Sequence, residues 1–114
     1  MSITKKVDDR GLFPGALEMM VLQSLRRKSM HGYALVQRIQ QTSRNLLQVE
    51  EGSLYPALQR MLLKGWVTAK WGVTAGNRRA RYYTLTKAGR KQLEAELSQF
   101  QRVNQAIIRV IQTA

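Results

Sequence analysis

The chain lacks cysteine altogether and carries little negative charge. None of its 114 residues is cysteine, which excludes a disulfide framework and a thiolate metal site. Only 7 residues are Asp or Glu against 19 Lys and Arg, so the formal net charge is +12. Such an excess of cations indicates an anionic partner, and nucleic acid is favoured over a merely solvated cationic surface.

Long apolar runs are also absent. The hydrophobic content of 44% is that of a globular protein, but no run approaches the roughly 18 residues that a membrane span needs. The opening residues, MSITKKVDDRGLFPG, have two lysines with no apolar stretch behind them, so we expect no secretory signal. The expected protein is cytoplasmic, has no membrane partner and forms one compact domain with one additional element.

Two helices are predicted in the N-terminal half, after a polar arm (residues 1–11) that we expect to be mobile. The first, over residues 14–28, has one apolar face and ends in three basic residues, where cations suit the helix dipole. The second, over residues 29–44, has a break at His31 and then an amphipathic pattern. Residues 45–52 are predicted to be a connection.

A third helix is predicted from the stretch GSLYPALQRMLLKG, in which apolar residues recur at helical spacing from Leu54 to Leu62. If Ser53 is the N-cap, Pro56 lies in the first turn, where a missing N–H costs little. Lys64 and the glycine after it end the helix. Because the apolar positions face inward, the remaining positions are candidates to read DNA: Ser53, Tyr55, Pro56, Gln59 and Arg60.

Beyond this helix the apolar residues no longer recur at helical spacing but at every second position. Residues 66–71 and 81–86 alternate and are rich in β-branched and aromatic side chains, which predicts a β-hairpin with a long basic loop over residues 72–80. The polar residues expected at its tip can pair with phosphates or enter a narrow minor groove: Asn77, Arg78, Arg79 and Arg81.

The aromatic residues of the hairpin are predicted mainly to pack. For Trp66 and Trp71, core or interface packing is favoured over ligand stacking, with one ring in the hairpin core and the other half exposed. Tyr82 and Tyr83 point to opposite faces of one strand, so at least one of them should be buried.

The last segment, residues 86–114, returns to helical spacing, and its apolar stripe is longer than a small domain can cover. A second copy of the chain is the simplest cover, and packing on Leu12, Phe13 and the first helix is the alternative. The predicted dimerisation residues are Leu93, Leu97, Phe100, Val103, Ile107 and Val110. The expected fold is mainly α with a small β-hairpin: a winged helix-turn-helix (residues 12–86) followed by a long dimerisation helix (87–114).

No catalytic, metal or cofactor site is predicted. Glu50 and Glu51 are adjacent, so they do not flank one reacting atom, and their place before a helix suits the dipole better than acid–base catalysis. The only histidine, His31, precedes a glycine at a helix start, where capping, packing or phosphate contact is expected. An enzyme is therefore not expected.

Several stretches together resemble the PadR family of bacterial transcriptional regulators: GALEMMVLQSL, MHGYALVQRI, EEGSLYPALQRMLLKGWV and RRARYYTLTKAGRKQL. The resemblance implies a winged-helix dimer, usually a repressor, on an inverted repeat near a promoter. It adds Tyr33 and Lys64 to the DNA contacts and identifies the terminal helix with the family's short subgroup. It also implies a small aromatic effector for some members, in a pore where Phe100 replaces a tryptophan, although dimer-core packing is favoured for Phe100.

The predicted function is thus sequence-specific binding of double-stranded DNA by a homodimeric regulator. Two alternatives stay open: a sequence-tolerant architectural protein that binds DNA or RNA, and a protein–protein interaction module. The first would bind with a steep salt dependence but little preference among sequences, and the second would leave the purified chain monomeric or aggregating.

Overall fold

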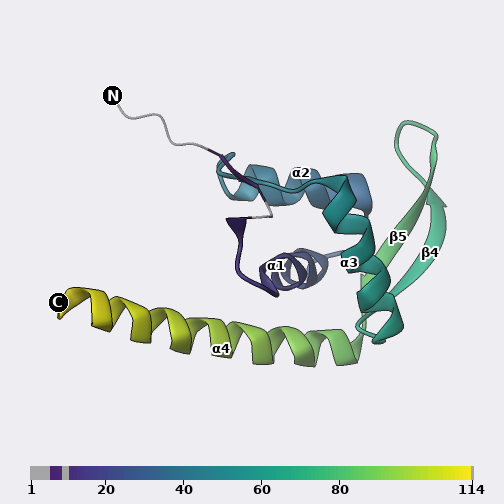
Figure 1. Ribbon diagram of the computed structural model, residues 1–114. Helices are drawn as coiled ribbons and strands as arrows, with labels where there is room; N and C mark the ends of the chain where they lie inside the picture. Colours follow the sequence, from purple (N-terminus) through teal and green to yellow (C-terminus); the bar gives the residue numbers. More distant parts are fainter. Residues whose placement is uncertain (1–5, 9–10, 114) are drawn as a thin grey trace.

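The computed structural model describes residues 6–8 and 11–113 and has the predicted class, a winged helix-turn-helix with a long C-terminal helix (Figure 1). In chain order the described elements are β1 (Val7–Asp8), α1 (Ala16–Leu25), β2 (Met30–His31), α2 (Gly32–Thr42), β3 (Leu47–Gln48), α3 (Glu51–Leu63), β4 (Val67–Val73), β5 (Arg79–Leu85) and α4 (Lys87–Gln112). None of the helices in the described ranges is long and apolar enough to cross a membrane.

The core lies where the first three helices, the base of the hairpin and the start of α4 meet. Its fully buried leucines come from four different helices: Leu22, Leu35, Leu54, Leu58 and Leu93. Each buried leucine contributes about 1.5–3 kcal/mol relative to an exposed one, so these helices hold one another in place. The outer face of α3 and the outer half of the hairpin remain free for another partner.

The sheet contains a strand that the sequence did not indicate. Its order is β2-β5-β4, with Met30 opposite Tyr83 and His31 opposite Tyr82. The prediction that residues 29–31 begin the second helix is wrong, because Met30 and His31 pair with a strand some fifty positions later. A strand of two residues is too short to show an alternating pattern in the sequence. As expected, one tyrosine of the pair, Tyr83, is buried.

Two helix ends differ from the prediction. α1 ends at Leu25, so Arg26, Arg27 and Lys28 lie beyond its last turn. α2 begins only at Gly32, where the Nδ1 atom of His31 accepts a hydrogen bond from the Ala34 N–H at 3.2 Å. The expected capping role of His31 is confirmed.

The prediction that Ser53 caps α3 is wrong. The helix begins at Glu51, and the Leu54 N–H donates to the Glu50 carbonyl at 3.0 Å. Pro56 therefore lies in the second turn and not in the first. Because proline has no N–H group, the Gly52 carbonyl lacks the helical hydrogen bond that residue 56 would otherwise donate. Because Gly52 is exposed, water can hydrate that carbonyl, and the proline is tolerated.

The hairpin is longer and its turn shorter than predicted. β4 continues to Val73 and β5 starts at Arg79, so the predicted loop over residues 72–80 shrinks to residues 74–78. Asn77 has a left-handed φ of 62° in this turn, a conformation that asparagine tolerates. Arg79 consequently lies on a strand and not in the loop, whereas Arg81 lies on a strand as predicted.

The predicted connection and the predicted arm also contain paired residues. Val7 and Asp8 form β1, which pairs in parallel with Leu47 and Gln48 of β3. The prediction that residues 45–52 only connect two helices is therefore wrong, because this segment contains β3 and the first residues of α3. Residues 1–5 and 9–10 of the arm lie outside the described residues.

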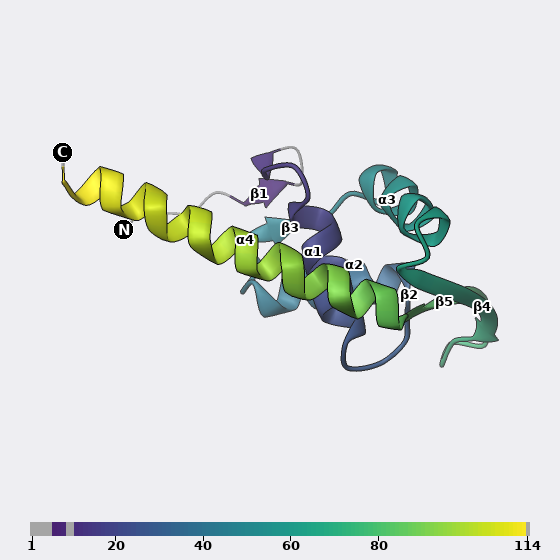
Figure 2. The ribbon, with the colours of Figure 1, turned by 90° about the horizontal axis from the view of Figure 1, so that it is seen from below.

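α4 starts against the domain and then leaves it (Figures 1 and 2). The Thr86 hydroxyl accepts a hydrogen bond from the Gly89 N–H at 3.0 Å and donates one to the Gly65 carbonyl at 2.6 Å. A Cβ on Gly89 would lie 2.0 Å from the Trp66 carbonyl oxygen, so only glycine permits this approach. Leu93 is fully buried in its own chain, which removes it from the predicted dimerisation residues.

Candidate nucleic-acid interface

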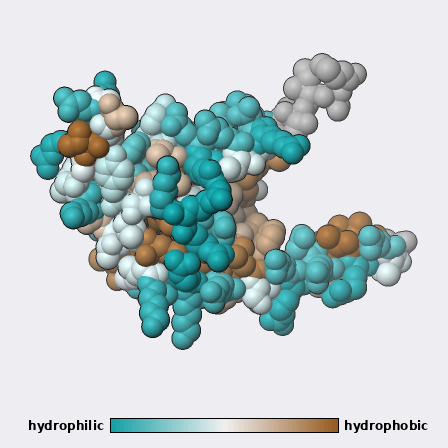
Figure 3. Space-filling view, turned by 180° about the vertical axis from the view of Figure 1, so that it is seen from behind, coloured by the Kyte–Doolittle hydropathy of each residue, from teal (hydrophilic) through white to brown (hydrophobic). Residues whose placement is uncertain are grey.

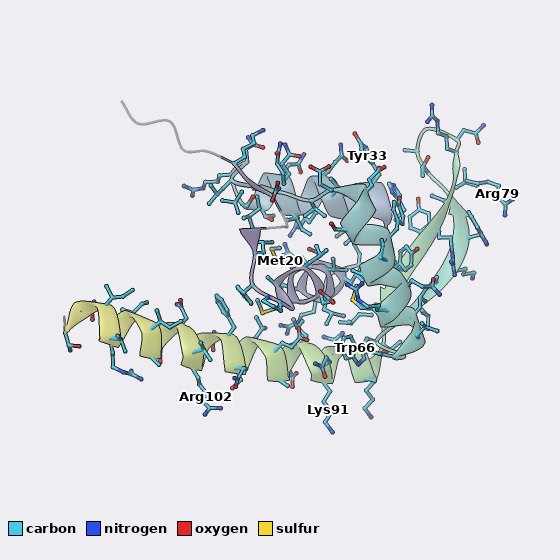
Figure 4. All side chains as sticks on the ribbon, viewed as in Figure 1. Met20, Tyr33, Trp66, Arg79, Lys91 and Arg102 are labelled. Atoms are coloured by element: carbon cyan, nitrogen blue, oxygen red, sulfur yellow. The ribbon has the colours of Figure 1, made fainter. Side chains whose placement is uncertain are left out.

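A groove of about 820 Å³ lies between α2, α3 and the hairpin, and we name it the wing groove. It is lined by His31, Tyr33 and Gln37 of α2 and its cap, Tyr55 and Gln59 of α3, and Trp71, Arg78, Arg79 and Arg81 of the hairpin. Tyr33 projects from α2 and Arg79 from the hairpin in Figure 4. Six of the predicted DNA-contact residues thus meet in one place: Tyr33, Tyr55, Gln59, Arg78, Arg79 and Arg81.

Tyr55 of α3 packs against Gly32 at the start of α2. A Cβ on Gly32 would lie 2.6 Å from the Tyr55 hydroxyl and 2.8 Å from its ring, so the bare backbone of Gly32 makes room for this side chain. Burial, followed by the negative charge of Glu51 and then by Tyr83, raises the pKa of Tyr55 above its ordinary value of 10.0. The phenol therefore keeps its proton at neutral pH and can donate a hydrogen bond.

The other flank of α3 faces α1 instead of the hairpin. Ser53, Pro56 and Arg60 line a separate groove of about 520 Å³ beside the start of α1. Arg60 Nη2 lies 3.2 Å from the Glu18 carboxylate. This exposed ion pair restrains a predicted reading residue, and a DNA phosphate would have to compete with Glu18 for it.

The last two predicted contacts lie at the ends of the surface. The Lys64 ammonium sits over the Trp66 ring, 4.7 Å from its centroid, at the C-terminal end of α3. Asn77 is exposed at the tip of the hairpin, where its N–H donates to the Thr74 carbonyl at 2.9 Å. Neither residue lines the wing groove, so each can touch DNA only at the margin of the surface.

Gln37 and Trp71 also line the groove, although neither was predicted as a DNA contact. Gln37 lies one helical turn after Tyr33, so its spacing could have indicated it. Trp71 is exposed, at 58%, and Trp66 packs against the core, which agrees with the expectation that one of the two rings is half exposed. Trp71 lies opposite Arg81 in the hairpin register.

A second cavity, of about 510 Å³, lies between the start of α1 and α4. The Phe13 and Phe100 rings stack at its wall with centroids 5.3 Å apart, which supports the intramolecular packing considered for Phe13. One oxygen of Glu96, Oε2, is buried at this wall and finds no hydrogen-bond donor in the described part of the chain, whereas Oε1 accepts from Gln92.

Comparison with known proteins agrees with this geometry. The model of the transcriptional regulator PadR-like family matches residues 21–95, which span the second half of α1 to the first third of α4. The chain belongs to the PadR-like family of transcriptional regulators. The family resemblance inferred from the motifs is confirmed, and so is the expectation of a regulator and not an enzyme.

Solved PadR-like proteins have the same fold. A PadR-family regulator from Eggerthella lenta is 26% identical with a TM-score of 0.76, covering 88% of this chain and 85% of its own. A PadR-like regulator from Bacillus cereus is also 26% identical, with a TM-score of 0.73 and coverages of 86% and 93%. A transcriptional regulator from Clostridium thermocellum, at 22% identity and a TM-score of 0.77, covers 83% and 92% and is similar in fold.

Among curated sequences, an uncharacterised Lysinibacillus sphaericus protein is 27% identical over 93 residues, which is 82% of this chain and 85% of that protein. A PadR-like regulator acts on DNA, so the partner class expected from the net charge agrees with the family. The wing groove of this PadR-like chain brings together tyrosines and three arginines that form no ion pair with a carboxylate among the described residues.

Proposed function

We propose that the chain is a homodimeric repressor that binds an inverted repeat at a promoter, with α3 in the major groove and the hairpin on the neighbouring backbone. The observation that supports it best is the wing groove, in which Tyr55 and Gln59 of α3 stand beside Arg78, Arg79 and Arg81. Tyrosine and glutamine offer hydrogen bonds to base edges, and arginine pairs with phosphates.

The apolar stripe of α4 supports the dimer. From the buried Leu93 the stripe continues through Leu97 and Phe100 to Ile107 and Ile111, beyond the reach of the domain. Hydrophobic surface gathers toward the free end of α4 in Figure 3. A second α4 would cover this surface and would place two reading helices roughly 34 Å apart, one turn of DNA.

Selection of bound fragments from genomic DNA at ~150 mM salt tests the proposal, because non-specific phosphate binding is suppressed there. Enrichment of an inverted repeat near a promoter, and lowered transcription from that promoter on adding the protein, are the expected results. Equal recovery of unrelated fragments would instead support the sequence-tolerant architectural protein that the net charge of +12 also permits.

We also propose a small aromatic, cationic effector in the cavity between α1 and α4. The stacked rings of Phe13 and Phe100 offer apolar faces, and the buried Glu96 oxygen lacks a donor in the described residues, which a ligand cation would supply. Titration with ethidium in the absence of DNA tests it. Glu96→Gln should weaken binding by about tenfold, and equal affinity for both proteins would contradict the site.

A further inference from the structure

Trp71 is the largest side chain in the wing groove and one of the most exposed aromatic residues of the protein. Single exposed apolar side chains are common on protein surfaces, so its exposure alone indicates nothing. What distinguishes Trp71 is its position in the outer half of the hairpin and the identity of the side chains around it.

Trp71 has two arginines of the neighbouring strand β5 beside it. Arg81 lies opposite it in the β4–β5 register, and the Cζ atom of Arg79 lies 4.8 Å from the centroid of the indole ring. The distance and placement are those of a cation–π contact, which restrains a guanidinium without neutralising it. Along β5, Arg81 in turn lies near Tyr83, 5.9 Å from its ring.

The positive charges of these two arginines are available to an external partner. Across residues 6–8 and 11–113, no carboxylate lies within ion-pair distance of Arg79 or Arg81, in contrast to Arg60, which pairs with Glu18. A guanidinium with one face on an indole still presents its N–H groups at the edge, in the geometry that binds a phosphate. Trp71 therefore holds the guanidinium of Arg79, which has no carboxylate partner among the described residues, at the rim of the groove.

The residues on the opposite wall of the groove indicate which part of the DNA would lie against Trp71. Tyr55 and Gln59 belong to α3, the helix proposed to enter the major groove. A DNA strand that borders the major groove would then run between α3 and the hairpin and bring its sugars and phosphates to Trp71 and Arg79.

We propose that Trp71 is a DNA-contact residue of the wing groove, which positions Arg79 for a phosphate and packs its own indole ring against the adjoining sugar. This inference rests on the proposed DNA-binding function of the groove. The competing explanation is that Trp71 only stabilises the hairpin through cross-strand contacts.

Tryptophan fluorescence tests the contact, because the chain has only two tryptophans. In the Trp66→Phe variant the emission comes from Trp71 alone, and in the Trp71→Phe variant it comes from Trp66, which packs against the core. The probe is a mixed-sequence duplex of about 30 base pairs at ~50 mM salt, where phosphate contacts dominate and no operator need be known.

We expect the Trp71 emission to change on titration with this duplex, with the midpoint given by the anisotropy of the labelled DNA, while the Trp66 emission stays nearly constant. Unchanged Trp71 emission at saturating DNA would overturn the inference and leave DNA binding itself intact. A wild-type chain that does not bind the duplex would overturn the proposed function as well.

A double-mutant cycle tests the positioning of Arg79. Trp71→Ala and Arg79→Ala should each weaken binding roughly five- to tenfold, and the double variant should lose clearly less than the product of the two losses, since Trp71→Ala already removes part of the Arg79 contact along with its own contact to the sugar. Losses that multiply independently would overturn the positioning role. Trp71→Phe keeps an aromatic ring in the strand, so it should retain most of the affinity and remains informative if Trp71→Ala unfolds the hairpin.

Discussion

At the scale of single residues, Tyr55 combines features that a DNA-reading side chain needs. It is partly exposed in the wing groove, its pKa is raised by burial and by Glu51, and Gly32 leaves room for its ring. Within the described part of the chain its hydroxyl makes no hydrogen bond, so it is free to donate one to DNA.

Replacing Tyr55 by Phe should weaken binding to the selected operator by about 0.5–1.5 kcal/mol while changing the affinity for random DNA much less, because the hydroxyl makes a specific hydrogen bond. Anisotropy titrations with both DNAs measure the difference. Equal losses on operator and random DNA would remove Tyr55 from the residues that read sequence.

The raised pKa of Tyr55 also predicts how stability changes in alkali. In the unfolded chain the phenol has its ordinary pKa of 10.0 and loses its proton first, so the free energy of unfolding falls as pH rises above about 10. The stability that the protonated phenol contributes is fully present below that pH. Urea unfolding across this range should show a shallower fall for Tyr55→Phe than for the wild type.

Gly32→Ala should displace Tyr55 and so weaken DNA binding more than it changes stability. The new Cβ meets the far end of a side chain that can rotate away, so we expect the free energy of unfolding to change by less than about 1 kcal/mol. In a Tyr55→Ala background, which lacks the ring, the same substitution should have no further effect on DNA affinity. An equal loss in both backgrounds would show that Gly32 acts independently of Tyr55.

At the scale of elements, the junction between the hairpin and α4 fixes where the long helix points. Thr86 caps α4 and also binds the Gly65 carbonyl, and Gly89 lies against the Trp66 carbonyl. One short segment therefore ties the end of α3, the foot of the hairpin and the start of α4 together.

Thr86→Ala removes both hydroxyl hydrogen bonds and should lower the free energy of unfolding by about 1–2 kcal/mol. Thr86→Ser keeps the hydroxyl and serves as the matched control, with a loss of less than about half that amount. Urea denaturation of the three proteins measures both values. A serine variant as unstable as the alanine variant would show that the methyl group, and not the cap, is what matters.

At the scale of the whole molecule, the chain is more extended than one compact domain. Its radius of gyration is 15.7 Å, where about 13 Å is typical for a compact chain of this length. The difference comes from α4, whose second half carries the exposed apolar residues Val103, Ile107 and Val110 away from the domain. A positively charged surface and an uncovered apolar helix together fit a protein that binds DNA as a dimer.

Ile107→Glu should shift the protein toward monomers, because it places a charge in the apolar surface that a second α4 would cover. Gln105→Glu introduces the same charge off the apolar stripe and should leave self-association unchanged. Sedimentation velocity of both variants measures this. Dissociation by both substitutions, or by neither, would contradict the proposed interface.

The sequence by itself determined the class of the fold, the family and six of the residues that line the wing groove. Helical spacing around Leu54 and Leu58 located α3, and alternation located the hairpin, because these patterns follow from the geometry of each element alone. The cluster of arginines after the hairpin turn indicated the anionic partner in the same local way.

Only the tertiary structure decided what depends on contacts between distant segments. β2 exists because Met30 and His31 meet β5. α3 begins at Glu51, with Leu54 and Leu58 buried and with the carbonyl that Pro56 leaves without a donor on the exposed Gly52. Packing likewise separated Arg60 from the wing groove, buried Leu93 within its own chain and left Trp71 exposed beside Arg79. Burial and pairing are properties of the assembled chain, and for that reason no local pattern specifies them.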